Sequence, residues 1–428
     1  MTGKILKYLI FLILFLTSSN IFDSRDNYIS RNEVDMNSFI KDMVSDSIES
    51  DTDVIDKYFT EGMSIDDIKS LLTNRPKDIK STGKYEPIYY DFSNMLHYKD
   101  IEEMLYNMNR LDIVNLEQLY KTVDDRYIYG IEIGKGNKVI YIDAGIHAGE
   151  VGNTVILMQF LSEILNEYYT GNKDIINKLN NVKLAIIPCI NPDGYEIYNF
   201  GKKSINNKNL WIYENYDILN IEHLKSNANG VDINRNFPSQ TGGLLFKKEK
   251  IMKSVAFDKS TKAGKHFPGY SLGSEQETKS CIYFMLKHYR NMYAYIDMHS
   301  QGRVIYNGKP NLSKEFNNLS RKFAKYISSY NKYKVHGLSA EEVGRGNDGT
   351  ATDFMAELAH GFKFCLKTGR LCSSSYIDNH ASLMYNYPVI TMESLTTYTR
   401  DVELFKTEYY DKKLRDILYD MLDGNFIK

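Results

Sequence analysis

The chain has 428 residues, of which 43% are hydrophobic and 25% are charged, as in an ordinary globular protein. Its 53 Lys and Arg residues nearly balance 55 Asp and Glu residues, so no strong field favours nucleic acid or an anionic membrane. Four cysteines are too few for a disulfide scaffold, and they form no Cys-x-x-Cys metal motif. Free thiols are expected, although spacing leaves a Cys365–Cys372 pair open.

The first 20 residues have the layout of a secretory signal. Lys4 and Lys7 precede an apolar run from Tyr8 to Leu16, and small polar residues follow. The run is shorter than the ~20 residues of a transmembrane helix, but no Ala-x-Ala cleavage site follows, so an uncleaved anchor stays an alternative. Residues 21–85 are polar and acidic, which indicates an appendage or linker, with a removed pro-segment as a further alternative. We expect an exported, secreted or cell-envelope protein.

Helices and strands alternate along most of the remaining chain. In chain order, the sequence predicts helix 101–108, strand 126–134, strand 138–142, helix 154–169, strand 182–188, helix 275–289, strand 292–298, helix 314–330, strand 388–392 and helix 402–422. This alternation predicts one α/β domain over residues 86–428, with a sheet covered by helices on both faces. Ligands of such sheets bind at the carboxyl ends of the strands.

Two metal-ligand side chains follow strand 138–142. His147 and Glu150 are three residues apart, in a turn just before the next predicted helix. Hydrolytic zinc sites use three protein ligands, and two His with one Glu is a known set. His299 directly follows strand 292–298, so its side chain is expected at the same edge of the sheet. A lone histidine is more often a satisfied polar residue, but beside a His-x-x-Glu turn we expect a third zinc ligand.

Glu393 ends another apolar strand, 388–392. A buried acid in that place must be paired, solvated or functional. In a zinc site it can take the proton of water that the metal activates. Asn234 and Arg235 lie in a tight polar segment, where the guanidinium and the amide can bind a carboxylate. The same Asn-Arg-Asn segment would otherwise be a surface turn.

Six ordered motifs resemble those of the zinc carboxypeptidase family, over about residues 86–400. They are His147-Ala-Gly-Glu150, Asn191-Pro-Asp-Gly194, Gly230-Val-Asp-Ile-Asn-Arg-Asn-Phe237, Pro268-Gly-x4-Ser-Glu-x-Glu-Thr278, Asp297-Met-His-Ser300 and Ile390-Thr-Met-Glu393. The resemblance implies a single domain with a central mixed, twisted sheet between helices, and one zinc ion held by His147, Glu150 and His299. It also implies that Glu393 is the general base and that Asn234 and Arg235 bind the substrate's terminal carboxylate.

Two departures from the family pattern concern the substrate. The family has an arginine upstream of the Asn-Arg pair that polarises the scissile carbonyl, but residues 211–229 contain none, so Lys225 is our candidate, with a solvated loop lysine as the alternative. Arg345 stands about where the family has its mobile tyrosine, which leaves Tyr376 and Tyr398 as candidates for that role.

The segment His299-Ser-Gln-Gly-Arg-Val-Ile-Tyr306 is similar to bacterial family members that cut the γ-D-glutamyl-diaminopimelate bond of cell-wall peptides. Diaminopimelate carries a second amine and a second carboxylate, for which Arg345, Asp348 and Arg303 are candidate partners. A general extracellular carboxypeptidase and an inactive peptide-binding protein are the alternatives. Residues 361–385 form a lid or an insertion. We expect a monomer whose partner is a peptide with a free terminal carboxylate.

Overall fold

The computed structural model describes residues 62–73, 76–79, 81–240, 262, 266–309, 312–337, 349–365, 369–372 and 384–426, together with the backbone of 44–45. The predicted signal, residues 1–20, and most of the predicted appendage therefore lie outside the described residues. So do Arg345, Asp348 and Tyr376.

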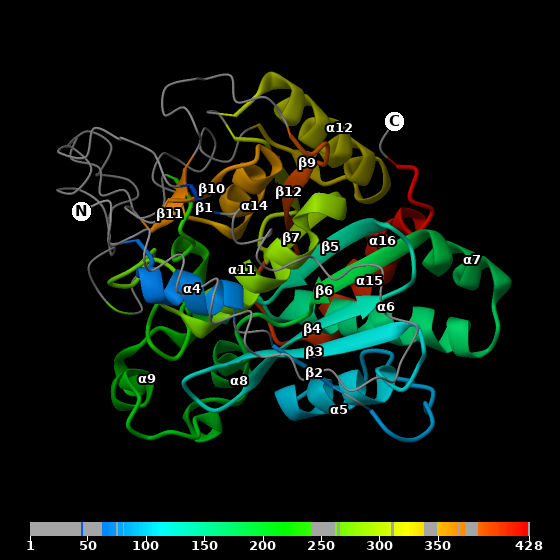
Figure 1. The fold of residues 1–428 in the computed structure, drawn as a ribbon. Coiled ribbons are helices and arrows are strands. Elements are labelled where there is room, and N and C mark those ends of the chain that lie inside the picture. Colours follow the sequence, from blue (N-terminus) through cyan, green and yellow to red (C-terminus); the bar gives the residue numbers. More distant parts are fainter. Residues whose placement is uncertain are drawn as a thin grey trace, which may run out of the picture.

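A nine-stranded mixed sheet forms the centre of the described part of the chain (Figure 1). Its spatial order is β2 (Lys77–Asp78), β3 (Val114–Lys121), β4 (Tyr127–Ile133), β6 (Val182–Ile187), β5 (Lys138–Ala144), β7 (Met292–Ser300), β12 (Val389–Ser394), β8 (Val304–Asn307) and β9 (Lys334–Val335). The central strands β6, β5, β7 and β12 are parallel to one another. The outer pairs β2–β3, β3–β4, β4–β6 and β12–β8 are antiparallel. The mixed α/β sheet expected from the sequence is confirmed.

The helices belong to the two faces of this sheet. On one face lie α5 (Tyr98–Met108), α6 (Val151–Tyr169), α7 (Lys173–Asn181), α15 (Val402–Tyr410) and α16 (Leu414–Met421), and on the other α4 (Ile65–Thr73), α11 (Gln276–His288) and α14 (Ala351–Ala359). Helix α12 (Lys314–Asn331) contributes to both cores. The shorter helices α8 (Pro192–Phe200) and α9 (Trp211–Asn215) lead to the loops around the candidate site.

The alternating direction of side chains along the central strands explains why helices cover both faces of the sheet. In β5, Ile140 and Ile142 enter the core under α6, whereas Val139 and Tyr141 enter the core under α11 and α14. Successive side chains of a strand point to opposite faces, so a strand that is apolar throughout is buried on both sides. This accounts for the continuous apolar runs from which the strands are predicted.

The predicted C-terminal helix 402–422 is wrong in one respect, since two helices replace it. Lys413 has a left-handed backbone conformation (φ 59°) and separates α15 from α16. The break lets both helices pack their apolar faces on the same core, through Phe405 and Tyr409 in α15 and Leu414 and Ile417 in α16.

The part of the chain before residue 86 contacts the domain where it is described. Met63, Ile68 and Leu71 pack in the core of α11 and α14, and β2 pairs with β3. Residues 363–365 (β10) and 370–372 (β11) form a small sheet with β1 (Val44–Ser45), and Met63 N donates to the Gly369 carbonyl. β10 and β11 belong to the predicted segment 361–385, whose residues 366–368 and 373–383 lie outside the described residues.

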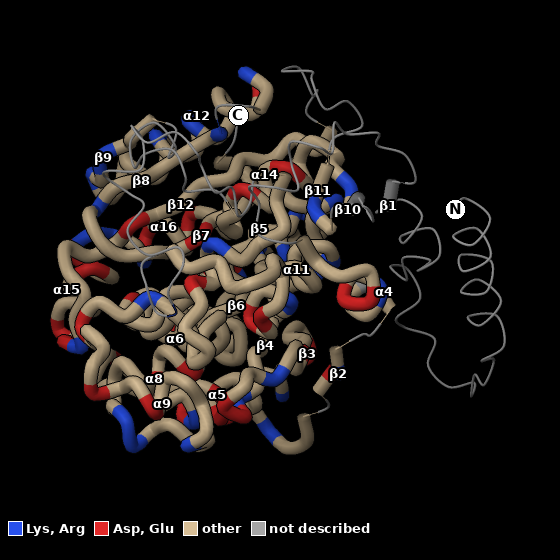
Figure 2. Tube along the Cα trace, turned by 90° about the vertical axis from the view of Figure 1, so that its left-hand side faces the viewer, with Lys and Arg blue, Asp and Glu red and all other residues tan. Residues whose placement is uncertain are grey.

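Charges of both signs are interspersed along the described chain (Figure 2), as the near balance of the composition implies. Within the described ranges, no helix has the length and apolarity needed to cross a bilayer.

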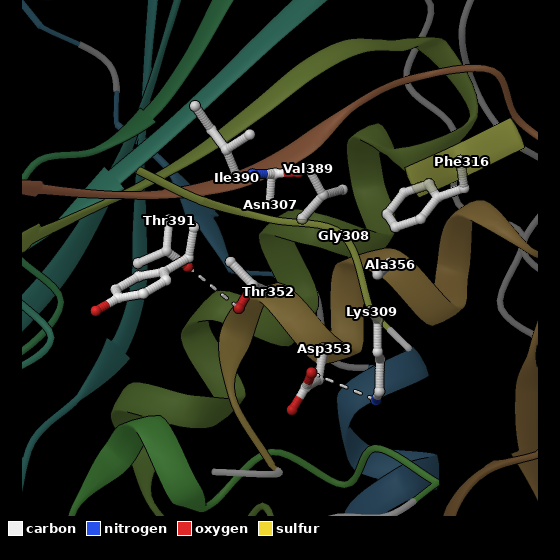
Figure 3. A pocket seen from close by; sticks show the side chains of 11 residues that line it. Asn307, Gly308, Lys309, Phe316, Thr352, Asp353, Ala356, Val389, Ile390 and Thr391 are labelled. Carbon is white, nitrogen blue, oxygen red and sulfur yellow. Dashed lines mark hydrogen bonds and ion pairs between the residues drawn. The ribbon is translucent and has the colours of Figure 1, made fainter. Parts of the chain in front are cut away.

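Cys189 and Cys281 are buried free thiols. The side chain of Cys365 lies outside the described residues, and with it the alternative of a Cys365–Cys372 pair. A small pocket lies between β8, β12 and the first turn of α14 (Figure 3).

Candidate metal centre and active site

The turn after β5 places His147 and Glu150. Gly145 begins it with a positive φ of 68°, and an added Cβ there would lie 2.6 Å from Thr154 Oγ1, so glycine is required. Gly149 N donates to the Leu224 carbonyl (2.9 Å), which ties the turn to the loop that carries Lys225. Glu150 is then the N-cap residue of α6, and its carboxylate contacts His147 rather than capping the helix.

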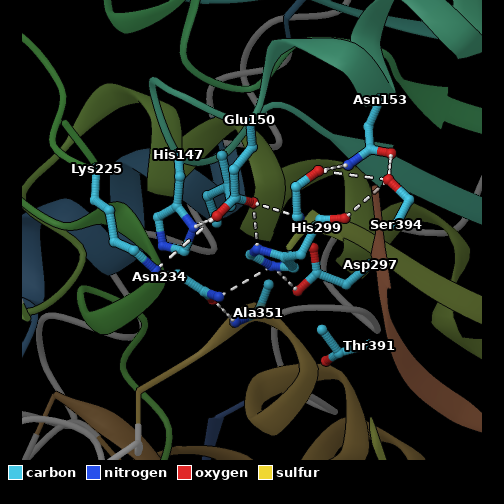
Figure 4. Close-up of polar contacts among 12 residues, drawn as sticks. His147, Glu150, Asn153, Lys225, Asn234, Asp297, His299, Ala351, Thr391 and Ser394 are labelled. Atoms are coloured by element: carbon cyan, nitrogen blue, oxygen red, sulfur yellow. Dashed lines mark hydrogen bonds and ion pairs between the residues drawn. The ribbon is translucent and has the colours of Figure 1, made fainter. Parts of the chain in front are cut away.

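The parallel strands β7 and β12 bring the other two predicted residues to the same edge. Their register pairs Glu393 with His299, so the predicted base and the predicted ligand come from adjacent strands at the same level. Ser394 Oγ donates to Asn153 Oδ1 (2.6 Å) and lies 3.3 Å from the His299 carbonyl, which ties the ends of both strands to α6 (Figure 4). The carboxyl ends of three parallel strands thus supply the site, as expected for such a sheet.

The two histidine rings converge on one carboxylate (Figure 4). His147 Nδ1 lies 2.7 Å from Glu150 Oε1, and His299 Nδ1 lies 2.9 Å from Glu150 Oε2. One ligand atom from each of the three residues falls within 4.8 Å of the others, and all three side chains are buried. Three buried donors that converge in this way fit a zinc ion with a His₂Glu ligand set.

Two aspartates that the sequence analysis left without a role lie close to the other nitrogens of the two rings. His147 Nε2 lies 3.2 Å from Asp232 Oδ1, and His299 Nε2 lies 3.0 Å from Asp297 Oδ2. Metal-binding histidines commonly direct their other ring nitrogen to a carboxylate, which fixes the tautomer that leaves the ligand nitrogen unprotonated. Each aspartate stands two residues from a predicted site residue, Asn234 or His299, inside a motif already noted, and this position is the signal that could have identified it.

Burial and the neighbouring charges shift the pKa values of two carboxyl groups of the site in opposite directions. Burial disfavours the charged form of Glu150, but His147 and His299 outweigh burial and hold its pKa below the ordinary value. Burial raises the pKa of Glu393 to about 7; Glu150 adds to this rise, whereas His299 and Lys225 oppose it. A carboxyl that titrates near neutral pH suits a group that must both accept and release a proton.

Lys225 reaches the site from the loop before Gly230. Its Nζ lies 3.9 Å from Glu150 Oε1, and 26% of its side chain is exposed (Figure 4). Tyr398 is also close to these carboxylates, since burial and the charges of Glu150 and Glu393 raise its pKa and Glu150 accepts its hydrogen bond. The structure therefore brings Lys225 and Tyr398 beside the ligands, although the sequence alone could not distinguish them from loop residues.

Asn234 and Arg235 lie in the short 3-10 helix η4 (Ile233–Arg235), and both are buried. Asn234 Oδ1 accepts a hydrogen bond from Ala351 N (2.9 Å), and its Nδ2 lies 3.1 Å from His299 Nε2. Arg235 Nη1 donates to the Asn234 carbonyl (2.5 Å). Arg303 is the third charged residue considered for diaminopimelate. Its Nη2 instead donates to Glu408 Oε2 of α15 (2.7 Å), so its guanidinium already has a carboxylate partner within the protein.

Comparisons with known proteins agree with this geometry. The family model for zinc carboxypeptidase matches residues 101–384. A gamma-D-glutamyl-L-diamino acid endopeptidase of Lysinibacillus sphaericus is 29% identical over 221 residues, which are 48% of this chain and 53% of that protein, so the match spans about half of that relative. Carboxypeptidase B2 of Bos taurus is 24% identical over 333 residues, 73% of each chain.

Among solved structures, bovine thrombin-activatable fibrinolysis inhibitor, in complex with tick carboxypeptidase inhibitor, has the same fold. The TM-score is 0.55 at 18% identity, and the match covers 79% of this chain and 99% of that one. The family model covers most of the chain, and the donor set of the site is that of a zinc peptidase. The chain belongs to the zinc carboxypeptidase family and is a zinc-dependent metallopeptidase.

Proposed function

We propose that this protein is an exported, monomeric zinc peptidase that hydrolyses the γ-D-glutamyl-diaminopimelate bond of cell-wall stem peptides. The observation that carries the chemistry is the convergence of His147, Glu150 and His299, with Glu393 on the adjacent strand. Support for the substrate comes from the similarity to the Lysinibacillus endopeptidase and from the motif that begins at His299.

Each protein group would have a separate part in the hydrolysis. Zinc, when bound, supplies a Lewis acid that polarises water and the scissile carbonyl. Glu393 would accept a proton from the attacking water as the new carbon–oxygen bond forms, and would pass that proton to the leaving amine as the carbon–nitrogen bond breaks. Lys225 would stabilise the negative charge that develops on the carbonyl oxygen.

Arg235 and Asn234 would hold the terminal carboxylate of the substrate. A buried guanidinium binds a carboxylate through two parallel hydrogen bonds, which fixes the position of the scissile bond as well as adding affinity. Arg235 is 6% exposed, so such a contact would be largely shielded from water. This arrangement favours cleavage of the last peptide bond of a chain.

Export is proposed from Lys4, Lys7 and the apolar run Tyr8–Leu16. Expression of the full chain in a bacterial host with cell fractionation tests it: we expect the protein outside the cytoplasm, and a cytoplasmic location would contradict the proposal. Mass spectrometry of the recovered protein would show whether the first 20 residues are removed.

The substrate is tested with two peptides and the zinc-loaded protein. One is L-Ala-γ-D-Glu-meso-diaminopimelate, and the other is a blocked peptide that ends in an ordinary L-residue. We expect mass spectrometry to detect released diaminopimelate. Release from the ordinary peptide alone would identify a general carboxypeptidase, and tight binding of both without cleavage would identify an inactive binding protein.

A further inference from the structure

Asn153 connects helix α6 to two strands of the candidate site. It lies in the first turn of α6, three residues after Glu150, and its side chain is fully buried. Its Oδ1 accepts a hydrogen bond from Ser394 Oγ at the end of β12 (2.6 Å; Figure 4). Its Nδ2 donates to Ser300 Oγ at the end of β7 (3.3 Å). One carboxamide of α6 therefore contacts the ends of both strands.

The two serines directly follow the predicted ligand and the predicted base. Ser300 comes after His299 and Ser394 comes after Glu393, and the register of β7 and β12 pairs the serines with each other. Successive side chains of a strand point to opposite faces. The residues two positions before each serine pack in the core under α6, so the serines also face α6. The contacts of Asn153 therefore lie on the opposite side of the strands from His299 and Glu393.

The three polar side chains form a closed ring of hydrogen bonds. Asn153 donates to Ser300, Ser300 Oγ lies 3.4 Å from Ser394 Oγ, and Ser394 donates back to Asn153. In this ring each side chain donates one hydrogen bond and accepts one, which a carboxamide and two hydroxyls can do. Asn153 and Ser394 are 0% exposed and Ser300 is 3% exposed. Because water cannot replace a lost partner at such a site, the ring fixes the separation of the two strand ends.

We infer that Asn153 is a positioning residue for the reaction, which fixes through Ser394 where Glu393 stands relative to His299. Glu150 caps the same helix and accepts a hydrogen bond from Ser300 N (3.0 Å), so one rigid element places a ligand and the base together. A displacement of about 1 Å between reacting groups slows an enzyme about a hundredfold. The inference rests on the proposed role of Glu393 as the base and does not depend on which peptide is cleaved.

Asn153→Ala gives the first test, with whichever peptide the protein cleaves. We expect kcat to fall about tenfold to hundredfold, because Glu393 loses its fixed position. KM should stay close to the wild-type value, since Asn234 and Arg235 lie in another segment. Zinc affinity, measured against a chelating indicator, and the visible spectrum of the cobalt-loaded protein should also be unchanged. A wild-type kcat, or weaker zinc binding that accounts for the loss, would overturn the inference.

Ser162→Ala is the matched control. Ser162 also lies in α6, is 1% exposed, and donates to the Met158 carbonyl within the helix (2.7 Å). This variant loses a buried hydrogen bond of the same helix but should keep the wild-type kcat. An equal loss of kcat in Ser162→Ala would show that any destabilisation of α6 slows the reaction, and would overturn the inference.

A triple variant keeps the test decisive if Asn153→Ala does not fold. Asn153→Leu with Ser300→Ala and Ser394→Ala removes the whole ring, so that no buried polar group stays without a partner. It should fold, bind one zinc ion and show the same loss of kcat. A folded triple variant with the wild-type kcat would overturn the role of Asn153.

A double-mutant cycle with Glu393→Gln separates this inference from the proposed function. If Asn153 acts through the base, Asn153→Ala should slow the Glu393→Gln variant little further, because the two changes remove one contribution. Losses that multiply would show that Asn153 acts elsewhere and would overturn only this inference. A Glu393→Gln variant as active as wild type would instead remove the base assignment of the proposed function.

Discussion

Asp232 holds the orientation of the His147 ring. One of its oxygens, Oδ1, lies 3.2 Å from His147 Nε2 and accepts a hydrogen bond from Asn234 N (3.1 Å). The same carboxylate therefore orients a ligand and the start of the segment that carries Arg235. A neutral amide oxygen could replace both contacts and would remove only the negative charge.

We predict that Asp232→Asn weakens zinc binding about tenfold to hundredfold, because an outer carboxylate raises the basicity of the histidine that it holds. Competition between the protein and a chelating indicator measures the affinity. Asp66→Asn is the control, since the Asp66 side chain is 97% exposed on α4. Zinc affinity equal to that of wild type would show that Asp232 does not act on the metal through His147.

Arg235 is predicted to recognise the free end of the substrate. Arg235→Ala should lower kcat/KM for a peptide with a free terminal carboxylate by about tenfold to hundredfold, because charge-assisted hydrogen bonds are lost. The amidated form of the same peptide offers no carboxylate and should change much less. Comparable losses on both peptides, measured side by side, would remove this role from Arg235.

Helix α14 carries the buried acid Glu357. This residue is 1% exposed, it accepts hydrogen bonds from Lys309 and from Gln240 N, and burial raises its pKa to about 7 although Lys309 opposes the rise. The folded protein therefore favours the protonated form more than the unfolded chain does. Stability from this group is complete below the unfolded value of 4.5 and is lost as the pH rises through about 7.

We predict that Glu357→Gln removes this pH dependence. The free energy of unfolding of the variant, minus that of wild type, should rise by up to about 3 kcal/mol between pH 5 and pH 8, and should level off above that. Urea denaturation at several pH values measures the difference, with Glu86→Gln at an exposed position as control. A difference that is independent of pH would show that Glu357 ionises in the folded state as easily as in the unfolded chain.

The central elements could be predicted from the sequence because they are locally distinctive. β5, β6, β7 and β12 are short apolar runs, and α6, α11 and α12 have long helical patterns. β3 could not be recognised in the same way, because Val114-Asn-Leu-Glu-Gln-Leu-Tyr-Lys121 mixes polar and apolar residues without a clear period. β2 is only two residues long, and its pairing with β3 is set by tertiary contact rather than by its own sequence.

At the scale of the whole molecule, the cluster of His147, Glu150 and His299 could be predicted because each residue follows a recognisable strand or stands inside a short motif. The pocket between β8, β12 and α14 could not, because Lys309 follows β8 and Asp353 begins α14, far apart in sequence, and only the packing of α14 against β12 brings them together. Arg303 illustrates the opposite case: it is close in sequence to His299, but its side chain binds Glu408.

Zinc titration of the metal-free protein tests the assignment of the active site as a whole. Hydrolysis of the preferred peptide should rise linearly with added zinc and stop rising at one zinc per chain, as three ligands for one ion require. Glu393→Gln should bind the same single zinc, yet turn over about a hundredfold to ten-thousandfold more slowly, because only the base is lost. Activity that does not depend on zinc, or a Glu393→Gln variant as active as wild type, would contradict the site described above.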